Sequence, residues 1–216
     1  MNGPAGSGPP WSSPAGPRSG ELFAAEQQLL GAGLQSVALS SGLALDRGEG
    51  ALLFDVDGRA HIDFMAGVGV ASVGHAHPRH VAAISRQAAR LSVGSLTTEV
   101  RLELLRRLVP LLPGKLGRLQ LYSGGAEAVE AAIRLAKSCT GRGELVAFRG
   151  GYHGKTNLTL ALSGALDGSG LGPFPAGVHI LPYGDCARCP LRLRHPGCEL
   201  ACLAAGRRQL ARAGVR

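Results

Sequence analysis

One stretch of the sequence, between residues 119 and 148, constrains the fold more than any other. The short apolar run Leu119–Tyr122 precedes a glycine turn, and apolar residues then recur at helical spacing over Ala126–Cys139. Gly141 is a typical helix stop, and Glu144–Phe148 is a second apolar run. A strand, a helix and a strand at this spacing form a right-handed crossover. The sequence therefore predicts a parallel α/β sheet.

Other predicted elements lie on both sides of this unit. Gly67–Gly74 alternates small residues with valine, which indicates a close approach of two backbone segments. An Asp-Gly turn predicts a β-hairpin, and Pro78 fits the first position of a helix. The predicted elements are a helix at Glu21–Gln35, hairpin strands at Ala51–Asp55 and Ala60–Phe64, helices at Arg79–Leu91 and Glu99–Leu112, a strand at Val178–Leu181 and a helix from Glu199.

Charge and hydropathy exclude several classes of partner. The net charge is +8, but the basic residues are mostly arginines scattered singly or in pairs, without aromatic interleaving or a nucleic-acid motif. No nucleic-acid partner is predicted. No apolar run is long enough to cross a membrane, and the first residues do not form a signal peptide. We predict a cytoplasmic protein without a membrane partner, whose five cysteines are reduced or bound to metal.

The glycine turn Ser123-Gly124-Gly125 lies where a strand is predicted to end and a helix to begin. Glycines let backbone amides approach a ligand closely, and the first amides of a helix lack partners within it. The helix dipole also attracts anions to this end. The turn and Ala126 are therefore a candidate phosphate site, to which the Ser123 hydroxyl adds a donor. A plain tight turn is the alternative, and neither the dinucleotide fingerprint nor the P-loop is present.

A second turn, Gly150–Thr156, follows the next predicted strand. Ligands of parallel sheets bind at the carboxyl ends of the strands, so both turns are expected to face one crevice. Tyr152 is then placed to lay its ring against a flat cofactor whose phosphate is held at the first turn. The alternatives are a half-buried core aromatic at Tyr152 and a structural histidine at His153.

A series of motifs occurs in order between about Ala38 and Gly164. They are Arg47-Gly48-Glu49-Gly50-Ala51, Asp55-Val56-Asp57-Gly58-Arg59, Ile62-Asp63-Phe64, Gly67-Val68-Gly69-Val70, Gly74-His75-Ala76-His77-Pro78, Pro113-Gly114, the Ser123 turn, and Tyr152-His153-Gly154-Lys155-Thr156. In this order they resemble the class III aminotransferases, which include acetylornithine, 4-aminobutyrate and ornithine transaminases.

The resemblance implies the amino-terminal half of a fold type I pyridoxal-phosphate transferase. The fold class is α/β, with an incomplete, mainly parallel sheet, flanking helices and an amino-terminal hairpin segment. It implies transamination from an amine or amino acid donor to a 2-oxo acid acceptor, in a homodimer when complete. Ser123, Gly124, Gly125 and Ala126 would hold the cofactor phosphate, and Tyr152 would stack on its ring. The hairpin and the Gly67–His77 segment would help form the substrate entrance and the dimer contact.

Three departures from the family pattern limit these expectations. Gly124 stands where the family has a serine, which removes a hydroxyl contact to phosphate. Lys155, the predicted substrate-binding residue, replaces an arginine that often grips a substrate carboxylate, and a lysine is not an equivalent donor. The family's Schiff-base lysine and the aspartate that pairs with the pyridine lie beyond the second turn, and no lysine follows Lys155. We therefore expect no catalytic nucleophile and an inactive truncated chain.

Four cysteines, Cys186, Cys189, Cys198 and Cys202, fall close together near the end of the sequence. Four thiols meet the ligand count of a tetrahedral zinc site, and thiolates also hold iron–sulfur clusters. The alternative is a set of reduced, semi-buried cysteines, because the spacing is not one usual for zinc fingers. Cys139 is expected in the core of the domain.

We predict three regions along the chain. Residues 1–20 form a disordered tail rich in Gly, Pro and Ser, because such a stretch cannot bury enough surface to order itself. Residues 21–75 form the amino-terminal helix and β-hairpin segment. Residues 76–216 form a truncated large cofactor-binding α/β domain with a cysteine-rich insert at 183–202. The alternatives to an enzyme half are an inactive interaction or dimerisation module and a metal-binding module built on the four clustered cysteines.

Overall fold

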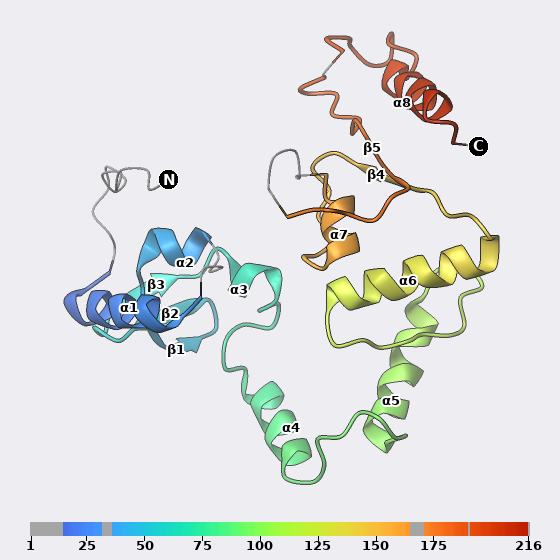
Figure 1. Ribbon diagram of the computed structural model, residues 1–216. Coiled ribbons are helices and arrows are strands. Elements are labelled where there is room, and N and C mark those ends of the chain that lie inside the picture. The colour runs from blue at the N-terminus through green and yellow to red at the C-terminus, as the bar shows by residue number, and fades with distance from the viewer. Residues whose placement is uncertain (1–14, 32–35, 165–170, 190, 216) are drawn as a thin grey trace. The chain divides into compact units, whose positions relative to one another are not determined.

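The computed structural model describes residues 15–31, 36–164, 171–189 and 191–215, and it divides into two units. Unit 1 runs to Thr98, and unit 2 begins at Glu99. Figure 1 colours both along the chain. Most of the predicted 1–20 tail lies outside the described residues, and the predicted division into three regions stays a prediction.

Unit 1 is built around a three-stranded antiparallel sheet. Strand β1 (Leu45–Glu49) pairs with β2 (Leu52–Asp55), and β2 pairs with β3 (Ala60–Ile62). The predicted hairpin is confirmed by the pairing of Leu53 with His61, whereas the residue pattern alone did not predict β1. The unit also contains α1 (Pro17–Leu29), α2 (Ser36–Ser41), the short turn α3 (Ala66–Gly69) and α4 (Pro78–Ala88), which begins at the expected proline.

The hairpin turn determines where α1 begins. Both carboxylate oxygens of Asp57 accept backbone N–H groups at the start of this helix, from Arg18 at 3.0 Å and from Ser19 at 2.9 Å. These amides have no partner within the helix, so the carboxylate satisfies them and matches the helix dipole. The helix consequently begins at Pro17, ahead of the Glu21 expected from hydrophobic periodicity.

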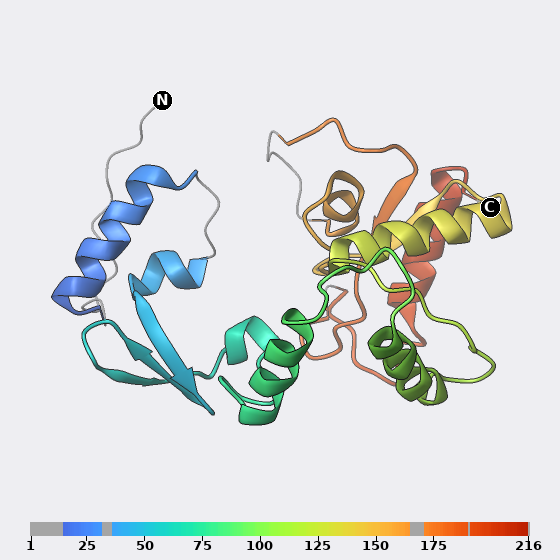
Figure 2. The same cartoon turned by 90° about the horizontal axis from the view of Figure 1, so that it is seen from below.

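Unit 2 contains the predicted parallel strand pair. Strands β4 (Leu145–Phe148) and β5 (Val178–Leu181) run parallel, with Leu145 opposite Val178. The helices are α5 (Glu99–Leu108) with a 3-10 turn η1 (Val109–Leu111), α6 (Gly125–Thr140), α7 (Asn157–Leu162) and α8 (Ala201–Arg212). Helix α7 packs against α6 and both strands, and α8 packs against β5 (Figures 1 and 2).

The predicted strand at Leu119–Tyr122 is wrong, because this run is not part of any strand. A strand needs a neighbour for its backbone N–H and C=O groups. The described part of unit 2 contains one ladder, between β4 and β5. The apolar run therefore lies in coil, with Leu121 and Tyr122 exposed.

The core is small and lies in unit 2. The buried hydrophobic residues among those described all lie on α6, α7, β4 and β5: Ala131, Ala147, Ala161, Leu162 and Leu181. Larger apolar side chains on these elements, such as Leu135 and Phe148, remain exposed. Cys139 is also exposed, so its predicted place in the core is wrong, because it lies on a face of α6 that nothing described covers. None of the helices described is both long and apolar enough to cross a bilayer.

Candidate functional site

The first turn of α6 is open. Its N-cap, Gly124, is extended (φ −155°, ψ 164°) and contributes no side chain, and the first helical bond runs from the Ala128 N–H to the Gly124 carbonyl at 3.0 Å. The amides of Gly125, Ala126 and Glu127 precede that bond, so helix geometry gives them no partner. Apart from its chain neighbours and the backbone of α6 itself, no atom of the described residues lies within 4 Å of where a Cβ on Gly125 would be. This helix end is therefore accessible to an anion.

The second turn packs directly against this helix end. A Cβ on Gly154 would lie 2.6 Å from the Ala126 Cβ and 2.7 Å from the Thr159 Oγ1, and Gly154 has a φ of +130°. Only a glycine fits such a contact and such a backbone. A second link joins the two segments, because the Thr156 hydroxyl donates to the Glu130 carboxylate at 2.7 Å. The structure thus brings the Tyr152–Thr156 turn onto the first turn of α6.

Buried hydroxyls at the start of α7 hold the second turn in place. The fully buried Thr159 Oγ1 accepts the Thr156 N–H at 3.0 Å, which forms a capping box. The Ser163 hydroxyl donates to the Thr159 carbonyl at 2.9 Å and accepts the His153 N–H at 3.3 Å. The turn is therefore fixed at both ends, and α7 fixes its position against β4 and β5.

The side chains of the predicted site differ in exposure. Tyr152 is 73% exposed, so it is not a half-buried core aromatic in this structure. Ser123 and Lys155 are also exposed. His153 has its N–H bonded to Ser163, and its ring lies against Gly151, where a Cβ would be 3.0 Å from Nε2. These contacts agree with a structural histidine.

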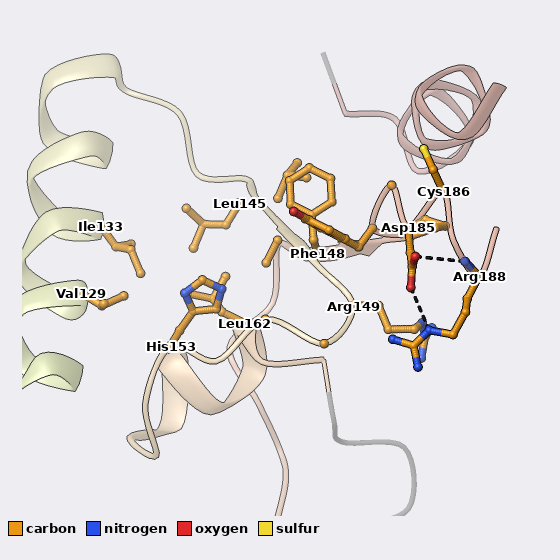
Figure 3. Close-up of a pocket in the computed structure, with 17 residues that line it drawn as sticks. Val129, Ile133, Leu145, Phe148, Arg149, His153, Leu162, Asp185, Cys186 and Arg188 are labelled. Atoms are coloured by element: carbon orange, nitrogen blue, oxygen red, sulfur yellow. Dashed lines mark hydrogen bonds and ion pairs between the residues drawn. The ribbon is translucent and has the colours of Figure 1, made fainter. Parts of the chain in front are cut away.

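A cavity of about 1050 Å³ in unit 2 is lined by none of the predicted cofactor or substrate residues. Figure 3 shows Val129 and Ile133 of α6 and Leu145 of β4 around it, with Asp185 bound to Arg188 at the other end. Within the described residues, β4 is paired along one edge only. We interpret this apolar space as uncovered sheet core rather than as a ligand pocket, since buried strands need cover on both edges.

The structure does not support the predicted metal site at the cysteines. The described residues include no group of three or more His, Cys, Asp or Glu side chains arranged to hold a metal ion. The prediction of zinc or an iron–sulfur cluster at Cys186, Cys189, Cys198 and Cys202 is therefore not supported. All five cysteines have free thiols. Sulfur atoms that lie near one another still need a common point at bonding distance before they bind an ion.

Sequence reasoning gave no role to Asp63, which organises the glycine-rich segment of unit 1. Its carboxylate accepts the N–H groups of Met65 and Gly67, both at 3.0 Å, and bonds to His75 Nε2 at 2.7 Å. The hydrogen bond with His75, assisted by the two amides, lowers the pKa of Asp63 below its usual value. The sequence feature that indicates this role is an acidic residue ahead of a glycine run, because the backbone amides of such a run need acceptors.

The segment that Asp63 holds is left-handed. Four consecutive residues, Ala66–Gly69, have positive φ values of 47°, 60°, 65° and 81°. Such a conformation costs an alanine or a valine about 1–2 kcal/mol. The predicted close approach is confirmed nearby, because a Cβ on Gly74 would lie 3.0 Å from the Gly50 Cα.

A second such aspartate, Asp55, is 2% exposed. It accepts the N–H groups of Asp57 and Arg59 and bonds to His61 at 2.9 Å. Burial would raise the pKa of Asp55, but these hydrogen bonds outweigh it and leave the pKa lowered. Both aspartates therefore serve the fold of unit 1.

Comparison with known proteins identifies the family. The profile of the family described as aminotransferase class-III matches residues 35–206. An acetylornithine aminotransferase of Streptomyces clavuligerus is 42% identical over 147 residues, which cover 67% of this chain and 36% of that protein. A 5-aminovalerate aminotransferase of Pseudomonas aeruginosa is 37% identical over 143 residues, covering 64% of this chain and 32% of the relative. The chain thus spans about a third of the length of these curated relatives.

Solved structures agree. An (S)-enantioselective omega-transaminase from Thermomicrobium roseum matches with a TM-score of 0.77 at 28% identity, over 90% of this chain and 46% of the other. An ornithine aminotransferase from Toxoplasma gondii matches with a TM-score of 0.67 at 27% identity, over 78% and 41%. Both neighbours are transaminases, and their fold is that of the fold type I pyridoxal-phosphate enzymes. The family profile covers most of this sequence, so the chain belongs to the class III aminotransferases, a family that uses pyridoxal phosphate.

Proposed function

We propose that this chain is the phosphate-holding part of a transaminase that transfers an amino group from an amine or amino acid to a 2-oxo acid. One observation carries the proposal: Gly154 packs on Ala126 and thereby sets the Tyr152 turn beside the open amides of α6. A phosphate group and a flat ring can then be held from adjacent backbone segments. The names of the relatives, which include acetylornithine and 5-aminovalerate aminotransferases, support this class of substrate.

The residues present fit a phosphorylated cofactor. The amides of Gly125 and Ala126 and the hydroxyl of Ser123 would bind the phosphate, and no side chain caps this helix end. Glu127 is the one acidic group in the first turn, and its carboxylate lies 3.9 Å from where a Cβ on Gly124 would be. The exposed Tyr152 ring is free to stack on a pyridine ring. Pyridoxal phosphate would supply the electron sink for amino transfer.

The exposed Lys155 is the candidate for binding a substrate carboxylate, as a point charge rather than a two-pronged donor. In the family, the lysine that is attached to the cofactor lies beyond the second turn. Lys115 and Lys137 precede this turn and Lys155 lies within it, so none of them is that lysine. We therefore expect no amino transfer by this chain alone. We also propose a homodimer for the complete enzyme and a cytoplasmic location.

Binding of pyridoxamine 5′-phosphate tests the proposal on the chain as it exists. This probe carries an amine, so it does not condense with the lysines, and its affinity reports the phosphate site itself. Calorimetry or ligand fluorescence should show weak binding of pyridoxamine 5′-phosphate and at least tenfold weaker binding of unphosphorylated pyridoxamine. Equal affinity for the two compounds would remove the phosphate site.

A matched pair of variants locates the bound phosphate. Gly125→Asp places a carboxylate at the first helical position, where it suits the helix dipole but repels phosphate. Its melting temperature should stay level or rise, while the affinity for pyridoxamine 5′-phosphate falls at least tenfold. The control, Gly143→Asp, changes the same residue type beyond the far end of α6, also in open space. Equal losses in both variants would show that the probe responds only to net charge.

A further inference from the structure

The cysteine-rich segment leaves β5 and returns to it. The segment, residues 183–202, begins just after β5, which ends at Leu181. It leads into α8, and this helix packs back against β5. The Gln209 side-chain amide donates to the Ile180 carbonyl at 3.0 Å. A Cβ on Gly206 would lie 3.1 Å from the Leu181 side chain. The two ends of the segment are therefore held beside each other by one strand.

Helix geometry then places Cys202 against the start of the segment. Cys202 precedes Gly206 by four residues on α8, so both lie on one face, one turn apart. Since Gly206 faces Leu181, Cys202 faces the residues that follow Leu181. The two segments are close together, because a Cβ built on Gly184 would lie 3.9 Å from the Cys202 sulfur. Cys186 is two residues further along.

Cys186 and Cys202 also line one small cavity, of about 30 Å³, together with Cys189, Cys198 and the imidazole of His195. Cys186 is exposed and Cys202 is half-buried, so small molecules can reach the pair. Figure 3 shows the Cys186 sulfur pointing toward a helix, and the residues that line the small cavity include Ala201 at the start of α8. The backbone between the thiols is unusual, since Glu199 and Leu200 are both left-handed, at φ 47° and 56°.

We propose that Cys186 and Cys202 are a thiol pair that a small-molecule disulfide of the glutathione type oxidises to a disulfide. One protein thiolate attacks the external disulfide, which forms a mixed disulfide and releases one reduced thiol. The second cysteine attacks the protein sulfur of that mixed bond and releases the second reduced thiol. Two protein thiols are oxidised, one external disulfide is reduced, and the two thiol protons end on the released thiols.

The bond would tie the start of α8 to the segment after β5. Tyr183, Asp185 and Cys186 also line the larger cavity beside β4. Oxidation would therefore hold that part of the cavity wall in place. The cofactor residues lie elsewhere in unit 2, so the thiol pair does not depend on the proposed function.

Thiol counting and peptide mapping test the pair on the full chain. After incubation with oxidised glutathione, the reactive thiols should fall from the five of the sequence to three, without bound glutathione. Trypsin cleaves after Lys155, Arg188, Arg192, Arg194 and Arg207, which separates Cys186, Cys189 and the Cys198–Cys202 pair into three peptides. We expect a cross-link between peptides 156–188 and 195–207. It should persist in Cys198→Ser and disappear in Cys202→Ser.

A control and three outcomes complete the test. Cys139→Ser removes the cysteine of α6, which does not line the small cavity, and should leave the cross-link unchanged. Any other pairing, including one within 195–207, would overturn the proposal. Glutathione that stays attached to Cys186 would do the same. So would stoichiometric metal in the purified chain that shields the thiols until a chelator is added.

Discussion

Two glycine-rich turns in this chain use their backbones in opposite ways. In unit 1, the Asp63 carboxylate accepts the N–H of Gly67, in the segment from Ala66 to Gly74, and the N–H of Met65, which precedes that segment. In unit 2, the turn Ser123–Gly125 leaves the first amides of α6 without a side-chain cap and without close neighbours among the described residues. Both turns look alike in sequence as runs of small residues.

The difference lies in what surrounds each glycine. A Cβ on Gly74 would meet backbone at 3.0 Å, whereas a Cβ on Gly125 would meet nothing described. A turn whose N–H groups already bond to acceptors within the fold has few of them left for a ligand. A turn whose amides remain open at a helix end can bind an anion. Glycine content alone does not separate the two cases, but the acceptor side chains nearby do.

The largest expected effect is at the contact between the two turns of unit 2. Gly154→Ala would bring a methyl group to 2.6 Å from the Ala126 Cβ, at a φ of +130° that alanine rarely adopts. Overpacking and backbone strain together should cost about 2–4 kcal/mol. Chemical denaturation followed by circular dichroism measures the loss. Gly143→Ala, in open space, is the control, and equal stabilities of the two variants would refute the contact.

A matched pair of alanine substitutions compares the turns directly. Gly74→Ala meets the Gly50 backbone at 3.0 Å and has a φ of +84°, so it should destabilise unit 1 by about 1–3 kcal/mol. In Gly125→Ala the added methyl group would lie in open space, so stability should change by less than about 0.5 kcal/mol. Hydrogen exchange resolved by peptide assigns each effect to its unit. A larger loss from Gly125→Ala would reverse our interpretation of the turns.

Acid should weaken the turn of unit 1 before it affects the turn of unit 2. The pKa of Asp63 is lowered in the folded state, chiefly by the hydrogen bond with His75. Its contribution to stability is therefore complete above the unfolded pKa of about 3.8 and is lost as the pH falls through the lower folded value. The protection factor of the Gly67 amide, taken relative to its intrinsic exchange rate at each pH, should fall below about pH 4. Asp63→Asn should flatten this dependence, and an unchanged profile would contradict it.

Much of the fold was predictable from local pattern. The hairpin, the proline at the start of α4, the Gly141 stop of α6 and the parallel pairing of β4 with β5 all follow from short-range signals and are confirmed. The run Leu119–Tyr122 failed, because a strand depends on a distant neighbour that its own residues do not specify. The start of α1 was misplaced for the same reason, since its cap comes from Asp57, far along the chain.

The candidate site was predictable in outline only. Ser123, Gly124 and Gly125 were recognised as a turn before a helix, and the open end of α6 agrees with that geometry. The contact of Gly154 with Ala126 was not predictable from spacing, because it depends on the buried hydroxyl of Thr159. The cysteines show the converse, since ligand count and spacing do not determine where four sulfur atoms point.

A small stabilising effect is expected at Val68, the β-branched residue of the left-handed segment. Its φ of 65° costs about 1–2 kcal/mol, which a glycine would not incur. Glycine also loses about 0.5–1 kcal/mol through greater freedom in the unfolded chain, so Val68→Gly should stabilise unit 1 by about 0.5 kcal/mol. Val70→Gly is the matched control, because Val70 is exposed like Val68 but has an ordinary φ of −110°. That variant should be destabilised. Changes of opposite sign in the two melting temperatures would show that Val68 is strained in the turn of unit 1, and two losses of equal size would show that it is not.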